Sequence, residues 1–227
     1  KKPLTYDLDN VPVKTQAIPG GVRTIQATGP LSGVQKKMDI TLSKKSNGVR
    51  IVHTLINRSR KPVELAPWAL TVLAPGGMEV IPMPKKIPHT ARLTHNQEWS
   101  LWGYTDFTDG RWMLGRKYVF FTQSRNRGPG KLGIAHREGW VAYLLGEFMF
   151  VKRFKFVEGA KYPDGGMNFE TFSNEAMLEM ESLGPLVKLA PGKSVSHEER
   201  WSLFKGVRHC RTEADIGRYV LPLARRG

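Results

Sequence analysis

Residues 38–57 read MDITLSKKSNGVRIVHTLIN, and this stretch decides the fold class. Apolar and polar residues alternate on both sides of Lys44–Gly48, which is the period-two pattern of half-buried β-strands. The polar residues between the two runs favour a turn, and Asn47-Gly48 is expected to supply the positive φ that a tight turn needs. The stretch therefore predicts an antiparallel hairpin of two strands, Val34–Ser43 and Val49–Asn57.

The same pattern recurs along the chain. Short alternating or apolar runs are separated by Gly, Pro, Asn and Lys at intervals of about 8–12 residues, as in an antiparallel sandwich or barrel. Helical character is confined to Thr212–Leu221, where Glu213 and Asp215 suit the helix dipole. We therefore predict an all-β fold with a short C-terminal helix. The further strands expected are Val22–Thr28, Val63–Ala74, Met78–Pro82, Tyr118–Thr122, Leu132–Ala135, Trp140–Leu145, Phe148–Phe156, Met167–Phe172, Met177–Leu183, Val187–Leu189 and Ser194–Phe204.

The chain is strongly basic. Its 227 residues include 35 Lys and Arg against 20 Asp and Glu, a formal net charge of +15. Such a charge favours anionic partners, but the basic residues are spread over turns and chain ends, so a solvated surface and an anion-binding face both stay open. No nucleic-acid-binding motif is found, and no apolar run reaches the roughly 18 residues of a membrane span. We expect neither nucleic acid nor a membrane as a partner.

Few metal ligands are present in recognisable patterns. Cys210 is the only cysteine, which excludes an internal disulfide and a cysteine-based zinc site. The histidines have no second ligand at a recognisable spacing, so no cofactor is expected. A structural calcium ion remains open, because oxygen ligands are available at Asp106, Asp109, Asp164 and Glu170.

The chain is expected to form one domain. No linker, internal repeat or low-complexity stretch divides it, so residues 1–227 are predicted to form a single β-sandwich domain. Residues 1–10 contain no apolar signal region, so either the chain is not exported or its signal has been removed. A periplasmic or secreted location is favoured over a cytoplasmic one, and the oligomeric state is left open.

The segment 83–117 departs from the strand pattern. It lacks alternation and contains Trp99, Trp102, Tyr104, Phe107 and Trp112. A long aromatic loop in a compact domain is usually functional or packed as a lid, so we predict a lid-like insertion here. Trp102, Tyr104 and Trp112 have side chains that stack on pyranose faces; the alternative is a loop that packs on its own aromatic residues.

Four carboxylates follow in a short part of the chain. Residues 162–172 read YPDGGMNFETF and residues 177–186 read MLEMESLGPL, which places Asp164, Glu170, Glu179 and Glu181 among Tyr162 and Asn168. Glu179 and Glu181 are two residues apart and therefore share one face of a strand. Such a mixture of flat apolar faces and hydrogen-bonding groups suits either a sugar ring or a junction between two sheets. In the second case, an Arg or Lys from a neighbouring strand, such as Arg153 or Arg200, would neutralise the glutamates.

Several segments together resemble the galactose-mutarotase-like β-supersandwich superfamily, and within it most closely a bacterial family of unknown function. They are residues 53–77 (HTLINRSRKPVELAPWALTVLAPGG), 103–112 (GYTDFTDGRW), 151–154 (VKRF), 162–174 (YPDGGMNFETFSN) and 183–204 (LGPLVKLAPGKSVSHEERWSLF). The resemblance covers about residues 20–205. It implies an antiparallel two-sheet fold whose concave face binds carbohydrate, and further strands before the region matched by Val22.

The resemblance also implies site residues. A late strand of the superfamily presents a glutamate base, which here corresponds to Glu179 or Glu181. A histidine normally supplies the acid, but the matching position reads Ala66-Pro67-Trp68. His89, His95 or Tyr104 is therefore expected to take that role.

The leading hypothesis is a carbohydrate-active protein, with acid/base chemistry of the epimerase or mutarotase kind if it is an enzyme. The catalytic candidates are the glutamates and acids just named, and the partner expected is a saccharide, neutral or anionic. One alternative is a non-catalytic glycan-binding module. Another is a lyase for acidic polysaccharides, in which Arg153 or Lys152 would neutralise a uronate. The residues expected to bind the saccharide are Trp102, Trp112, Arg153, Tyr162, Asn168 and Glu170.

Overall fold

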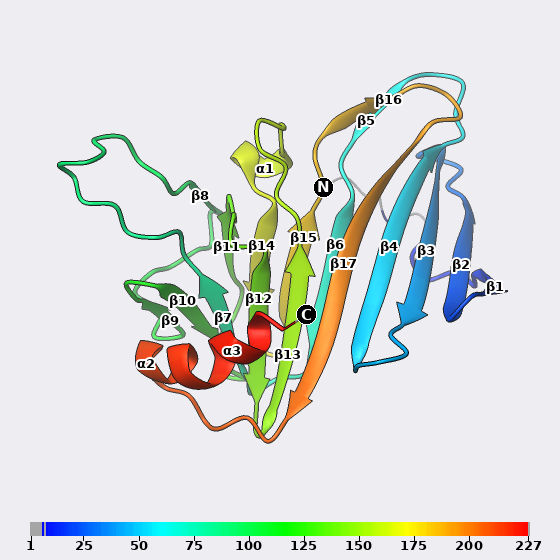
Figure 1. Cartoon of the computed structure of the whole chain (residues 1–227). Helices are drawn as coiled ribbons and strands as arrows, with labels where there is room; N and C mark the ends of the chain where they lie inside the picture. The colour runs from blue at the N-terminus through cyan, green and yellow to red at the C-terminus, as the bar shows by residue number, and fades with distance from the viewer. Residues whose placement is uncertain (1–5, 7, 227) are drawn as a thin grey trace.

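A computed structural model describes residue 6 and residues 8–226 (Figure 1). Its largest element is a ten-stranded antiparallel sheet with the order β1 (Lys14–Ile18), β2 (Gly21–Thr28), β3 (Val34–Leu42), β4 (Gly48–Asn57), β17 (Ser194–Lys205), β13 (Phe148–Phe154), β12 (Trp140–Leu145), β7 (Met78–Pro82), β10 (Tyr118–Thr122) and β9 (Trp112–Leu114). A five-stranded antiparallel sheet has the order β6 (Trp68–Leu73), β15 (Leu178–Leu183), β14 (Phe169–Ser173), β11 (Gly130–Ile134) and β8 (Trp99–Leu101). β5 (Val63–Leu65) and β16 (Val187–Leu189) form a separate pair.

The two large sheets pack face to face over one apolar core. Across this core the five-stranded sheet faces β7, β9, β10, β12 and β13. Side chains alternate along each strand, so every second one enters this core. Full burial of each large apolar side chain contributes about 1.5–3 kcal/mol to the free energy of folding. The core residues include Ile81, Val119, Phe121, Val141, Leu132, Phe169, Leu178 and Met180.

The C-terminal helical segment covers the opposite face of the ten-stranded sheet. It consists of α2 (Glu213–Asp215), η2 (Ile216–Val220) and α3 (Leu221–Ala224). Thr212 caps it, because its hydroxyl accepts from the Asp215 backbone while the Asp215 carboxylate accepts from the Thr212 backbone. At the other end, the Arg153 guanidinium donates to the Ala224 carbonyl, with Nε 3.1 Å away. The helix is therefore fixed at both ends.

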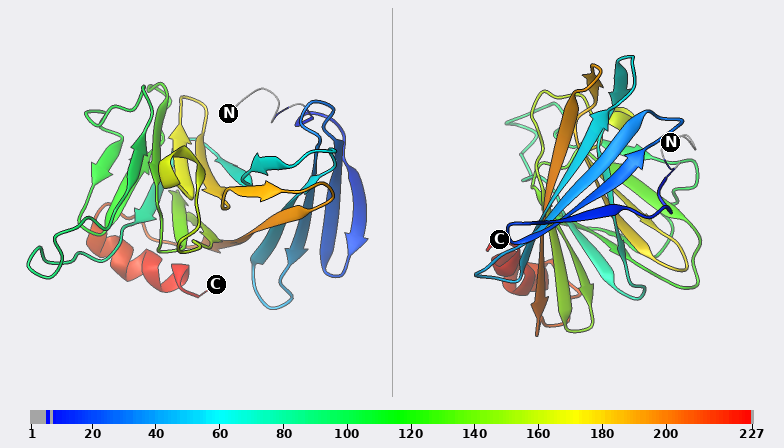
Figure 2. Two further views of the ribbon diagram at one scale, coloured as in Figure 1. Left: turned by 90° about the horizontal axis from the view of Figure 1, so that it is seen from above. Right: turned by 90° about the vertical axis from the view of Figure 1, so that its right-hand side faces the viewer.

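Strands β1 to β4 extend beyond the edge of the five-stranded sheet (Figure 2). The edge strand on that side is β6, so the inner surface of β2, β3 and β4 faces β6 across a hollow. A cavity of about 390 Å³ occupies it and is lined by His53 and Thr54 of β4 and by Trp68 of β6. The two-sheet arrangement thus leaves one concave surface uncovered by the apolar core.

The all-β prediction is confirmed, and so is the helix near the C-terminus. Three short strands, β1, β8 and β9, were not predicted, and the last two interrupt the segment expected to be a lid. The predicted strand Val63–Ala74 is divided at Ala66-Pro67, because proline cannot donate to a sheet. The prediction of a positive φ at Asn47-Gly48 was wrong, since neither residue adopts one. Instead, the Ser46 hydroxyl accepts from the Gly48 backbone at 3.3 Å.

Candidate functional site

A cluster of charged residues lies on the outer face of the five-stranded sheet. It consists of Lys131 on β11, Glu170 on β14, and Glu179 and Glu181 on β15; we call these four residues the acid face. Glu170 and Glu181 are register partners on adjacent strands, so their side chains leave the sheet side by side. Their neighbours in sequence point the other way, into the core. Strand alternation therefore builds the cluster.

Lys131 joins the two inner glutamates. Its Nζ lies 2.6 Å from Oε2 of Glu170 and 2.7 Å from Oε1 of Glu181. Lys131 is 5% exposed and both glutamates are fully buried. Burial alone would lower the pKa of Lys131, but Glu181 and Glu170 outweigh it and hold that pKa above its ordinary value. The lysine is therefore charged at neutral pH, and Glu179 lies half-buried next to the pair.

Aromatic side chains cover this cluster; Trp68, Trp102 and Tyr104 are called the aromatic cover. The Trp68 indole donates from Nε1 to Oε2 of Glu181 at 2.6 Å. The Lys131 ammonium lies 4.8 Å from the ring centroid of Trp102 and 5.7 Å from that of Trp68, within the range of cation–π attraction. The two half-buried indoles therefore lie directly beside buried charges.

Tyr104 gives the cover its exposed edge. It is 46% exposed. Burial of the remainder raises its pKa, and the nearby carboxylates add to this. The phenol is therefore protonated at neutral pH, so it can donate a hydrogen bond to a ligand.

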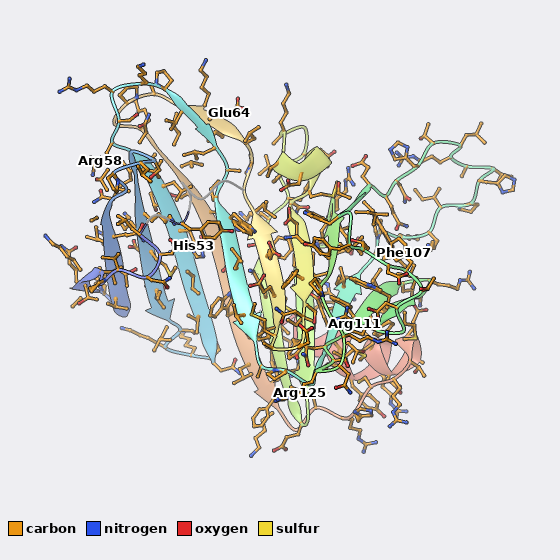
Figure 3. All side chains as sticks on the ribbon, turned by 180° about the vertical axis from the view of Figure 1, so that it is seen from behind. His53, Arg58, Glu64, Phe107, Arg111 and Arg125 are labelled. Atoms are coloured by element: carbon orange, nitrogen blue, oxygen red, sulfur yellow. The ribbon has the colours of Figure 1, made fainter. Side chains whose placement is uncertain are left out.

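Backbone contacts hold Trp102 in place. The Thr105 hydroxyl donates to the Lys131 carbonyl at 2.5 Å and accepts from the Trp102 backbone at 3.1 Å. Gly133 provides the space, because a Cβ there would lie 3.2 Å from the Trp102 ring and 2.8 Å from Cγ of Met167. Further along, Arg111 donates to the Gly128 carbonyl at 2.7 Å. Phe107 and Arg111 lie beside the five-stranded sheet in Figure 3.

Four of the predicted binding residues lie elsewhere and have structural contacts. Trp112 is 8% exposed and stacks on Phe121 at 3.5 Å between ring centroids, inside the core. The Tyr162 hydroxyl accepts from the Val157 backbone, and the Asn168 amide is bonded on both sides to the His136 backbone. Arg153, on the ten-stranded sheet, is held by the helix end described above. The structure thus brings together Glu170, Glu179, Glu181, Trp102 and Tyr104 from the predicted set.

The two candidate histidines do not adjoin the acid face. His89 and His95 are exposed on the stretch between β7 and β8, which runs away from both sheets (Figure 1). Nε2 of His95 lies 3.4 Å from Glu98, three residues further on. Their placement leaves Tyr104 as the candidate acid beside the glutamates.

A second buried polar network lies near the hollow and was not anticipated. Lys152 Nζ is 2.6 Å from Oε1 of Glu199, and the Ser182 hydroxyl lies 2.7 Å from Nε2 of His197. His53, which faces β6 from β4 (Figure 3), places Nε2 at 3.2 Å from Oε2 of Glu199. Burial favours the neutral carboxyl of Glu199, but Lys152 and His53 outweigh it and lower its pKa to about 2. Glu199 is therefore ionised across the neutral range.

Two of the expected oxygen ligands for calcium have protein partners. Asp106 accepts from the backbone and hydroxyl of Thr108, and Asp109 is paired with Arg111 at 2.8 Å. In the part of the chain that the structure describes, no group of three or more His, Cys, Asp or Glu residues is arranged to hold a metal ion. Within the same residues, no helix has both the length and the apolar character needed to cross a membrane.

Comparison with known proteins places the chain in a family. Residues 16–204 match the model of a domain of unknown function, DUF4380, so the chain belongs to that family. A search of curated proteins gives no match.

Solved structures share the fold. A galactose mutarotase-like protein from Lactobacillus casei is 10% identical, with a TM-score of 0.56 over 85% of this chain and 73% of that chain. A galactose mutarotase related enzyme from Lactobacillus acidophilus is 8% identical, with a TM-score of 0.53 over 89% of this chain and 74% of that chain. The galactose-mutarotase-like fold is therefore confirmed, and identities this low show the fold alone.

Proposed function

We propose that this DUF4380 member binds a saccharide at the acid face and its aromatic cover. The observation that carries the proposal is Lys131, a buried cation shared by Glu170 and Glu181 beneath two indole rings. The half-buried Glu179 and the exposed Tyr104 are the parts of this cluster that a ligand can reach.

The chemistry of the cluster suits a sugar ring. The half-buried carboxylate of Glu179 can accept a hydrogen bond from a sugar hydroxyl, and the Tyr104 phenol can donate one. Indole rings cover the apolar C–H faces of a pyranose without removing water from its hydroxyls. The proposal is also supported by the fold, which is shared with proteins described as mutarotase-like.

A finer proposal is acid/base chemistry at the anomeric carbon. In ring opening, a base takes the proton of the anomeric hydroxyl while an acid protonates the ring oxygen, and ring closure reverses both transfers. Glu179 or Glu181 would be the base and Tyr104 the acid. The two glutamates differ, because Glu181 accepts from Lys131 and from Trp68 whereas Glu179 is half-buried. Removing the base is expected to lower the rate at least about a hundredfold.

Binding and turnover are tested separately. Calorimetric titration with neutral and anionic monosaccharides measures binding, and polarimetric anomer exchange measures turnover. Trp102→Ala is expected to weaken binding about tenfold or more, given the size of stacking contributions. Glu198→Gln is the control for the Glu→Gln variants, since Glu198 lies on the surface and is paired with Arg50. Circular dichroism verifies that each variant is folded.

The outcomes separate the hypotheses. Loss of anomer exchange in Glu179→Gln or Glu181→Gln, with Glu198→Gln active, supports the epimerase. Saccharide binding without exchange in the wild type selects the non-catalytic module. No saturable binding of any saccharide, or full binding by both Trp102→Ala and Glu181→Gln, would refute the site.

The lyase alternative has less support. It required Arg153 or Lys152 to neutralise the carboxylate of a bound uronate. Arg153 donates to the Ala224 carbonyl, and Lys152 is fully buried against Glu199. Neither side chain points to the acid face.

A further inference from the structure

A second cavity lies on the other side of the molecule from the acid face. Its volume is about 870 Å³, and it is bordered by the end of β7, the turn between β9 and β10, and the C-terminal helical segment (Figure 1). That segment covers the face of the ten-stranded sheet that points away from the five-stranded sheet. Five basic side chains line this cavity, and we call them the basic pocket: Lys85, Lys86, Arg116, Lys117 and Arg225.

Strand register explains why cations distant in sequence meet here. Tyr118 pairs with Pro82 across β10 and β7, and the Met83 backbone donates to the Lys117 carbonyl at 2.8 Å. The residues after β7 therefore run beside the residues before β10, which brings Lys85 and Lys86 next to Arg116 and Lys117. Arg225 reaches the same cavity from the end of α3.

The basic pocket has an excess of positive charge. The five side chains are exposed, and among the described residues none of them forms an ion pair with a carboxylate. Two acids also line the cavity, Glu138 and Glu213. Oε1 of Glu213 accepts from the backbone of Lys117 at 2.6 Å and of Tyr118 at 3.1 Å, so that oxygen is already engaged. Five cations against two acids leave an attractive field for an anion.

We propose that the basic pocket binds a small organic ligand carrying phosphate groups, with at least two negative charges. Lysine and arginine together are the usual partners of phosphate. The volume falls within the range of small-molecule sites and exceeds what a single ion fills. Tyr118, Trp140 and Leu221 provide apolar wall for the rest of such a ligand. This site does not depend on the saccharide proposal.

Inorganic pyrophosphate is the probe. Its binding to the full chain is measured by calorimetry at low and at physiological salt, since charge attraction weakens as salt rises. The test variant is Lys85→Ala/Lys86→Ala/Arg116→Ala. The control variant, Lys44→Ala/Lys45→Ala/Arg60→Ala, removes the same number of positive charges from exposed positions outside the pocket.

The expected result is saturable binding by the wild type and by the control, with a dissociation constant about tenfold or more higher in the test variant. Equal weakening in both variants would show a general effect of net charge and overturn the proposal. Absence of saturable binding to the wild type at low salt would also overturn it. So would binding of a long sulfated oligosaccharide without binding of pyrophosphate, because that result indicates an extended polyanion surface.

Discussion

Replacing Lys131 by methionine tests whether the acid face is held together by the Lys131 ammonium. Methionine keeps most of the volume and the unbranched shape of lysine but removes the charge. Glu170 and Glu181 would then lie side by side on adjacent strands, fully buried and without the cation that now lies 2.6 and 2.7 Å from them. Breaking a buried pair from one side costs about 3–5 kcal/mol, because the remaining charge stays buried.

The measurement is urea unfolding at pH 7, followed by near-ultraviolet circular dichroism. The free energy of unfolding should fall by about 3–5 kcal/mol, which for a chain of this size corresponds to a melting temperature about 6–20 °C lower. A triple variant, Lys131→Met/Glu170→Gln/Glu181→Gln, removes the repelling charges as well and should recover much of the loss. The control is Lys155→Met, because Lys155 is exposed.

Two results would contradict the reasoning. A loss below about 1 kcal/mol in Lys131→Met would mean that the glutamates are not dependent on the lysine. A triple variant as unstable as Lys131→Met would mean that packing of the lysine stem, and not charge, is what the substitution removes.

Three further predictions concern the same layers. Gly133→Ala should shift Trp102 and lower the free energy of unfolding by about 1–3 kcal/mol, since the new Cβ would lie 2.8 Å from Cγ of Met167. Urea unfolding measures the loss, and an unchanged free energy of unfolding would contradict the prediction. Glu199→Gln should reduce the loss of stability that occurs as pH falls from about 4.5 to 2. The pKa of Glu199 is lowered to about 2 in the folded state, so its carboxylate adds stability above the unfolded pKa and this contribution is lost over that range. An unaltered loss of stability in acid titration of the variant refutes the prediction. Glu79→Gln should remove a decline in stability between about pH 4.5 and 8. Burial raises the pKa of Glu79 to about 8, so in this range the unfolded state has lost the proton that the folded state keeps, and stability falls as pH rises. A decline that persists in the variant contradicts the prediction.

Much of the fold could be predicted because its signals are local. Alternation over residues 38–57 fixes two strands of the large sheet, and the observed pair β3 and β4 agrees with it. The short strands β8 and β9 escaped because three residues are too few to display a period. The turn at Asn47-Gly48 misled because side-chain hydrogen bonds of serine give another way to close that loop.

The site could be predicted only in part. Alternation placed Glu179 and Glu181 on one face, and the structure brings Glu170 beside Glu181. Lys131 could not be found from sequence, because its partners are about forty and fifty residues away and only strand order joins them. Trp112 misled for a related reason: it lies in the same aromatic segment as Trp102, but its ring stacks on Phe121 in the core.

The net charge of +15 does not decide which ligand binds where. Charges farther apart than about 10 Å are largely screened at physiological salt, so each site responds to its own neighbours. Among the described residues, three glutamates stand beside Lys131 at the acid face, whereas at the basic pocket five cations face two acids. The overall charge therefore gives no support to an anionic saccharide at the acid face.

It follows that a uronate should bind there less tightly than the matching neutral sugar, and titration of galactose against galacturonate measures the difference. Tighter binding of the uronate, retained in the basic-pocket variant, would show that the acid face is not governed by its glutamates.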